Sequence, residues 1–205
     1  MQIIKQTWDL LAEKYAVSAT LSNQIFQDIT KAYTQKNRHY HTLVHIADLL
    51  AQTNIHENQI QDIDSIYFAI FFHDIVYKPT RADNEEQSAQ YAQKIMQSIK
   101  VNPTQIQKVD EYILATKKHL PMPMNTDLQF FLDADLSILA SDPSRYLLYT
   151  QQIRKEYSIY PDFAYKNGRK KALLSFLERE KIFYFYQDDK ERQARENIKN
   201  EIDSQ

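Results

Sequence analysis

The sequence predicts an all-α protein, and two features of it lead to this prediction. The chain of 205 residues contains only one glycine and six prolines, whereas sheets built from tight hairpins usually need several glycines in their turns. Apolar residues recur at helical spacing along most of the chain. We therefore expect a bundle of about nine or ten helices that forms one domain over residues 1–205.

Four helices are expected in the first third of the chain, at about residues 3–15, 18–33, 42–54 and 59–73. The fourth is the most informative, because its second half, Ile66–Phe72, is apolar all round, which is typical of a helix at the centre of a domain. His73 and Asp74 follow this run directly. A carboxylate in such a buried position needs a partner, and a metal ion can be that partner.

Six more helices complete the expected bundle. Asp83 or Asn84 caps one that runs to about residue 99, and Asn102–Pro103 starts another that ends near residue 118. The next helix opens at Thr126–Asp127 and carries Asp133 and Asp135. The last three are expected at about residues 143–157, 163–181 and 188–203.

Composition excludes several functional classes. The chain has no cysteine, which removes disulfides, thiolate zinc sites and cysteine nucleophiles, and too little glycine for a glycine-rich phosphate loop. Its net charge of -2 argues against broad nucleic-acid binding. No signal-like segment is apparent, and the longest apolar run is too short to cross a bilayer. We expect a cytoplasmic protein without a membrane partner, and its oligomeric state stays open.

Histidines and aspartates form the candidate site. His41 and His45 stand four positions apart, a spacing that a helix would place on one face, and His73–Asp74 and Asp135 are the partners they could meet. Each residue alone could be a satisfied core residue, but together they indicate a metal site. Imidazoles with carboxylates suit Mn, Fe, Co, Ni or Zn, and nothing in the set distinguishes these metals.

This pattern of a histidine, a His–Asp pair and a distant aspartate resembles the HD superfamily of metal-dependent phosphohydrolases. Tyr40–Asp48 is similar to the metal-site helix of cyclic-nucleotide phosphodiesterases, Phe72–Asp74 to the His–Asp segment, and Ala134–Ser137 to the segment with the last aspartate ligand. The chain also resembles small bacterial HD proteins in four short segments, residues 84–89, 116–119, 153–157 and 168–169. The metal pattern spans about residues 40–137, and a C-terminal helical extension would cover about 142–205.

The resemblance implies a role for each residue of the pattern. His45, His73, Asp74 and Asp135 would hold a divalent transition metal, and Asp74 could bridge a second ion. A metal-activated water would attack the phosphorus of a nucleotide or another small phosphorylated substrate, while His41 protonates the leaving group. No further histidine follows the His–Asp pair closely and no glutamine-centred base pocket is found, so the choice between one and two ions stays open.

Cations near these residues are candidates for contact with a substrate phosphate. They are Arg38, Lys78, Arg81, Lys117, Lys118 and His119, and the last could also support a second ion. Asp133 lies two positions before Asp135, so a helix would point it elsewhere, and we expect it to be structural or solvent-facing.

Two other functions remain open from the sequence. Some HD proteins bind two irons and activate oxygen, but they need extra histidine ligands, which only His41 and His119 could supply. A module that keeps its metal for structure or sensing, without turnover, is the second alternative. Metal analysis with a phosphatase panel separates hydrolysis from binding, and an iron-dependent oxygen-uptake assay isolates the oxygenase.

Overall fold

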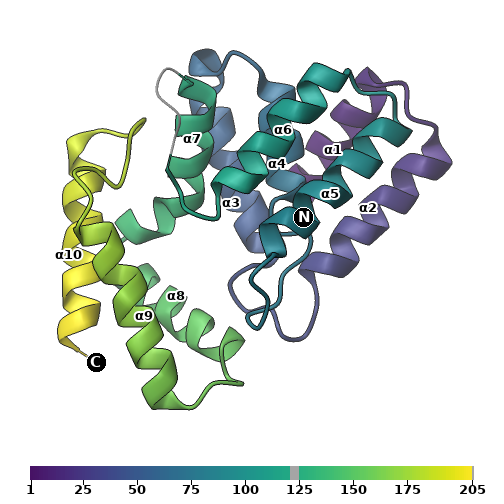
Figure 1. Ribbon diagram of the computed structural model, residues 1–205. Coiled ribbons are helices and arrows are strands. Elements are labelled where there is room, and N and C mark those ends of the chain that lie inside the picture. Colours follow the sequence, from purple (N-terminus) through teal and green to yellow (C-terminus); the bar gives the residue numbers. More distant parts are fainter. Residues whose placement is uncertain (121–124, 205) are drawn as a thin grey trace. The chain divides into compact units, whose positions relative to one another are not determined.

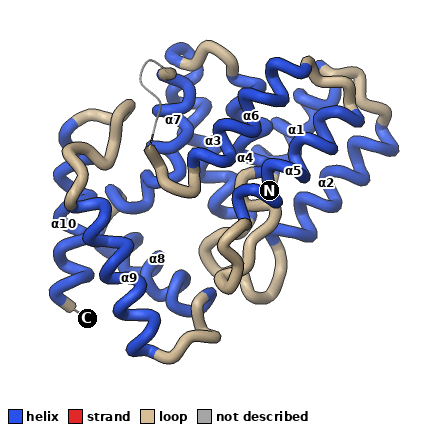
Figure 2. The backbone as a smooth tube through the Cα atoms, in the orientation of Figure 1, coloured by secondary structure: helices blue, strands red, loops and turns tan. Residues whose placement is uncertain are grey.

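A computed structural model describes residues 1–120 and 125–204, and every regular element in these residues is a helix (Figure 2). The all-α prediction is therefore confirmed, with ten α-helices and two short 3-10 helices in the described part. Contacts divide the chain into two compact units, Met1–Leu120 and Pro121–Gln205. That boundary falls inside the segment 40–137, and the expectation of one domain with an extension from about residue 142 stays a prediction.

Helix α4 is the centre of the first unit. It packs against α3, α5 and α6, and Figure 1 shows these helices around it. Phe68, Phe71 and Phe72 are fully buried. The rings of Trp8 and Phe71 pack edge to face, with their centroids 5.6 Å apart. The helices of this unit are α1 (Gln2–Lys14), α2 (Ala19–Tyr33), α3 (Leu43–His56), α4 (Ile63–Phe72), α5 (Asn84–Ser98), α6 (Pro103–Ala115) and the 3-10 helix η1 (Glu57–Gln59).

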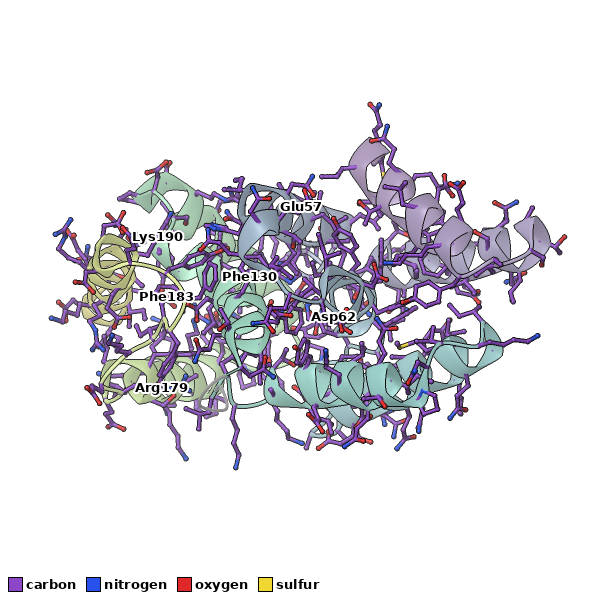
Figure 3. All side chains as sticks on the ribbon, turned by 90° about the horizontal axis from the view of Figure 1, so that it is seen from above. Glu57, Asp62, Phe130, Arg179, Phe183 and Lys190 are labelled. Carbon is purple, nitrogen blue, oxygen red and sulfur yellow. The ribbon has the colours of Figure 1, made fainter. Side chains whose placement is uncertain are left out.

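Two helix ends in this unit differ from the sequence-based expectation. α4 begins at Ile63, later than expected, because the Asp62 carboxylate accepts the Ser65 N–H at 3.2 Å and so caps the helix there. Figure 3 labels Asp62 at this end of α4. α6 ends at Ala115, before the expected residue 118, because His119 takes a positive φ of 47° and donates its N–H to the Ala115 carbonyl at 2.8 Å.

The second unit is built around the 3-10 helix η2, which packs against α7, α8 and α10. Asn197 of α10 donates its side-chain amide to the carbonyls of Leu139 at 2.9 Å and Ser141 at 2.8 Å, and thereby holds the end of η2. The helices of this unit are α7 (Thr126–Asp135), η2 (Leu136–Ala140), α8 (Pro143–Glu156), α9 (Asp162–Leu177) and α10 (Asp188–Asp203). Among the described residues, none of the helices combines the length and apolarity needed to cross a membrane.

Helix α9 has one buried residue among those described, Leu173, and ion pairs attach it to both neighbouring helices. Asp162 at its start binds Arg154 of α8 at 2.6 Å. Arg169 of α9 binds Glu201 of α10 through Nε at 2.8 Å and Nη2 at 3.0 Å. Tyr146 of α8 donates its hydroxyl to the same carboxylate at 2.6 Å. Burial and the nearby negative charge of Glu201 raise the pKa of the Tyr146 phenol, so its proton stays in this bond.

Candidate metal centre

The end of α4 places a histidine and an aspartate side by side. His73 closes the helix by donating its N–H to the Ala69 carbonyl at 2.8 Å, and Asp74 is the first residue beyond this turn. The side chain of His73 is 1% exposed, whereas that of Asp74 is 19% exposed. The apolar run that ends at Phe72 is thus followed by a buried imidazole, that of His73, and by a partly exposed carboxylate, that of Asp74.

The ring of His73 has a defined tautomer. Its Nδ1 lies 3.0 Å from the Ile70 carbonyl oxygen. Because a carbonyl only accepts hydrogen bonds, Nδ1 carries the hydrogen, and in the neutral ring Nε2 is left with a lone pair. Histidine ligands of metals are commonly oriented in this way by a carbonyl on the far side of the ring.

Two further candidate ligand atoms lie close to this nitrogen. His73 Nε2 lies 3.2 Å from His45 Nε2 and 3.2 Å from Asp74 Oδ2. Two atoms that bind one ion at about 2.0–2.2 Å are about 2.8–3.6 Å apart at octahedral or tetrahedral angles, so each of these two atoms is at a distance at which it could share an ion with His73 Nε2. A carboxylate oxygen beside a bare ring nitrogen is also unfavourable unless a proton or metal ion lies between them. The donor set therefore fits a divalent transition metal.

His45 reaches this point from the first turn of α3. Thr42 caps the helix by accepting the Val44 N–H at 3.3 Å, so α3 begins at Leu43 and His45 faces inward, 4% exposed. The Tyr40 ring packs against the His45 ring, with their centroids 5.1 Å apart.

His41 lies before α3, outside the helix expected from about residue 42, so the spacing of four does not place it on one helical face with His45. Thr42 adopts an extended backbone, with φ -118° and ψ -178°, and separates His41 from the helix. The two rings are nevertheless 5.9 Å apart between centroids, and His41 Nε2 is 3.9 Å from Asp74 Oδ2. Tyr77 stacks on the His41 ring, with centroids 4.2 Å apart. With a side chain 19% exposed, His41 is at the edge of the cluster that solvent reaches.

Arg38 is buried, 5% exposed, and its guanidinium donates to main-chain carbonyls, including that of Asp74 at 2.7 Å. Its expected contact with a substrate phosphate stays a prediction. Sequence reasoning placed Arg38 near the site but missed these carbonyl contacts, since periodicity does not indicate which main-chain atoms a distant guanidinium meets.

The loop after Asp74 is fixed by two side chains of α5. Asn84 accepts the Lys78 N–H at 3.0 Å and donates to the Lys78 carbonyl at 2.9 Å. Ser88, one turn later, accepts the Val76 N–H at 3.1 Å and donates to the Val76 carbonyl at 3.2 Å. Each side chain thus occupies both main-chain groups of one loop residue. This gives the segment 84–89 a structural part in holding the loop.

The remaining candidate cations surround this loop. Lys78 is exposed, and Arg81 is exposed and paired with Asp83 at 2.8 Å. Lys117 donates to the Ala82 carbonyl at 2.8 Å and forms an ion pair with Glu86, which holds the pKa of that carboxyl below its usual range. Lys118 is exposed and His119 partly so. Their contacts with a phosphate stay predictions.

Asp133 and Asp135, both on α7 of the second unit, have different surroundings. Asp135 ends α7 and is partly exposed, and its role as a metal ligand stays a prediction. Asp133 is 1% exposed and structural, one of the two parts expected for it: its Oδ2 accepts the N–H groups of Tyr184, Phe185 and Tyr186 at 2.8, 2.6 and 3.0 Å. Burial raises the pKa of Asp133 to about 6, although these three bonds act in the opposite direction.

Comparison with known proteins assigns no family to the chain, since no family model, curated protein or solved structure matches it. The resemblance to the HD superfamily therefore depends on the residues of this sequence alone.

Proposed function

We propose that this protein is a metal-dependent phosphohydrolase of the HD type, which acts on a nucleotide or another small phosphate ester. One observation carries the proposal: His73 Nε2 lies 3.2 Å from His45 Nε2 and 3.2 Å from Asp74 Oδ2. A buried imidazole oriented by a carbonyl beside a solvent-accessible carboxylate is the combination that a catalytic metal site needs.

The ligands we assign are His45 Nε2, His73 Nε2 and Asp74 Oδ2, and from its sequence context we add Asp135. The donor set suits one or two ions of Mn, Fe, Co, Ni or Zn. A bound ion of this kind supplies Lewis acidity, which lowers the pKa of water towards neutrality and offsets the negative charge of a phosphoryl group.

The protein's own part in the reaction is proton transfer and orientation. His41 Nε2 lies 3.9 Å from Asp74 Oδ2, a position from which a protonated imidazole would donate to the leaving oxygen. Tyr77 packs against the His41 ring, with the two ring planes inclined by 33°, and so restricts its motion. The exposed cations Lys78, Arg81 and Lys117 would draw the phosphate towards this edge of the site.

Metal analysis followed by a substrate screen tests the proposal. Protein purified without chelators should contain a divalent transition metal, and chelation should abolish the hydrolysis of phosphate monoesters until that metal is restored. His45→Ala should lose both metal and hydrolysis. His56→Ala is the matched control, because His56 ends the same helix and its ring bonds Gln59 at 3.2 Å, and it should retain both.

Three results would contradict the proposal. Equal metal content in His45→Ala and the unaltered protein would remove the metal centre. Full metal content without turnover of any phosphate ester would favour a binding module, and iron-dependent oxygen uptake would favour an oxygenase.

A further inference from the structure

Arg38 joins two segments that carry residues of the candidate site. It lies between α2 and α3, and its Nη1 donates to the carbonyls of His41 at 3.4 Å and Asp74 at 2.7 Å. Its Nη2 donates to the Ile75 carbonyl at 3.1 Å. One guanidinium therefore contacts the main chain of both His41 and Asp74.

The main chain of Asp74 is held on both of its polar groups. Arg38 binds its carbonyl, and the Tyr33 hydroxyl accepts its N–H at 3.3 Å while donating to the Phe71 carbonyl at 3.2 Å. Both holding residues come from the end of α2 and the segment just after it. With its N–H and its carbonyl both bound, the Asp74 backbone has little freedom, which restricts the position from which its side chain extends.

Aromatic rings in turn hold the guanidinium. The Arg38 guanidinium carbon lies 5.0 Å from the ring centroid of Tyr33 and 5.5 Å from that of Tyr77, distances at which cation–π attraction is appreciable. Tyr77 is also the ring that stacks on His41. The same set of contacts therefore orients His41, Asp74 and Arg38 together.

We propose that Arg38 is a positioning residue of the metal centre, which sets the segments of Asp74 and His41 relative to each other through their main-chain carbonyls. The inference rests on the proposed function. The planar fork of arginine reaches the successive carbonyls of Asp74 and Ile75 with two separate nitrogens, a geometry that the single nitrogen of a lysine does not reproduce. Loss of such a supporting contact costs metal sites about 10–100-fold in metal affinity or activity.

Cobalt binding to metal-free protein provides the main test, together with amide hydrogen exchange at Asp74 and Ile75. Arg38→Ala should fold, as judged by circular dichroism, but bind Co²⁺ about 10–100-fold more weakly, and these two amides should exchange faster. Millimolar guanidinium, far below denaturing concentrations, should restore part of the affinity by entering the vacated space. Lys36→Ala, in the same segment but at an exposed position, should behave as the unaltered protein.

Two further variants keep the test decisive if Arg38→Ala does not fold. Arg38→Lys keeps the positive charge and should still lose Co²⁺ affinity, and Tyr33→Phe keeps the ring but removes the hydroxyl that holds the Asp74 N–H. Wild-type affinity and exchange in a folded Arg38 variant would overturn the proposal, as would a loss that merely tracks the unfolded fraction. Failure of the unaltered protein to bind Co²⁺ would instead overturn the proposed function, and the exchange rates would then show whether Arg38 orders Asp74.

Discussion

At the scale of single residues, His73 and His41 differ in the groups that surround their rings. His73 has its Nδ1 bound to a carbonyl, so its Nε2 is committed to the cluster. His41 instead combines a partly exposed ring with a carboxylate 3.9 Å away. The first arrangement suits a metal ligand and the second suits a group that exchanges its proton with solvent.

Removal of the His41 imidazole should separate metal binding from catalysis. His41→Ala should keep its metal, while turnover of a nucleoside monophosphate falls roughly 10²–10⁴-fold, the usual contribution of a general acid. The loss should be smaller for an activated aryl phosphate, whose leaving group needs no proton. Steady-state kinetics on both substrates with metal analysis checks this, and His39→Ala serves as a neighbouring control. Metal loss in His41→Ala would make the residue a ligand, and equal losses on both substrates would remove the acid.

Asp133 should matter for stability but not for the metal ligands of the first unit. Asp133→Ala leaves the N–H groups of residues 184–186 without their carboxylate, which should lower the free energy of unfolding by roughly 2–5 kcal/mol. Urea unfolding followed by circular dichroism measures this effect. Asp203→Ala, at an exposed position on α10, should change stability by less than about 0.5 kcal/mol. An unchanged unfolding midpoint for Asp133→Ala would show that water replaces the carboxylate without cost.

At the scale of elements, the sequence predicts the interior of helices better than their ends. α2 lies within a residue of its expected bounds, because Ser18 caps its start by accepting the Leu21 N–H at 3.4 Å. α10 has its expected bounds although no side chain caps its N-terminus. α9 ends at Leu177, before the expected residue 181, because Arg195 of α10 binds the carbonyls of Leu177 at 3.0 Å and Arg179 at 2.8 Å. The local sequence pattern of α9 cannot predict a contact with an arginine side chain of another helix.

The attachment of the loop after Asp74 to α5 should be measurable through Ser88. Ser88→Ala removes the partner of both the N–H and the carbonyl of Val76, so it should destabilise the protein by about 1–3 kcal/mol and speed amide exchange in residues 75–78. Thermal unfolding and hydrogen exchange test this. Ser98→Ala on the same helix is the control, since the Ser98 hydroxyl bonds only its local Ile95 carbonyl and is exposed. Equal effects of the two substitutions would mean that the loop is held by other contacts.

At the scale of the whole molecule, the fold class follows from composition and periodicity, but the long-range polar contacts do not. The sequence indicates His45, His73 and Asp74 because they sit beside strong helical patterns. It does not indicate that Arg38, Arg154 and Arg195 each bind main-chain carbonyls, since that depends on tertiary structure. The buried acceptor role of Asp133 was open for the same reason: its partners lie more than 50 residues away.

The division into two units allows the ligand assignment to be tested with a fragment. Residues 1–120 form a compact unit that contains three of the four proposed ligands, so this fragment should be helical and unfold cooperatively. Without Asp135 it should bind Co²⁺ more weakly than the full chain, and full-length Asp135→Ala should show a comparable loss. Calorimetric titration measures both. Wild-type affinity in Asp135→Ala would limit the centre to His45, His73 and Asp74.

The position of His73 and Asp74 just past the last residue of α4 has an electrostatic consequence. The aligned peptide groups of a helix give its C-terminal end a partial negative charge of about half an electron, which favours nearby cations. Because Phe71 and Phe72 are fully buried, little water screens this field along α4. The guanidinium of Arg38 already lies at this end of the helix, bound to the carbonyls of residues 74 and 75. The backbone of α4 therefore attracts positive charge to this point whichever side chains occupy it.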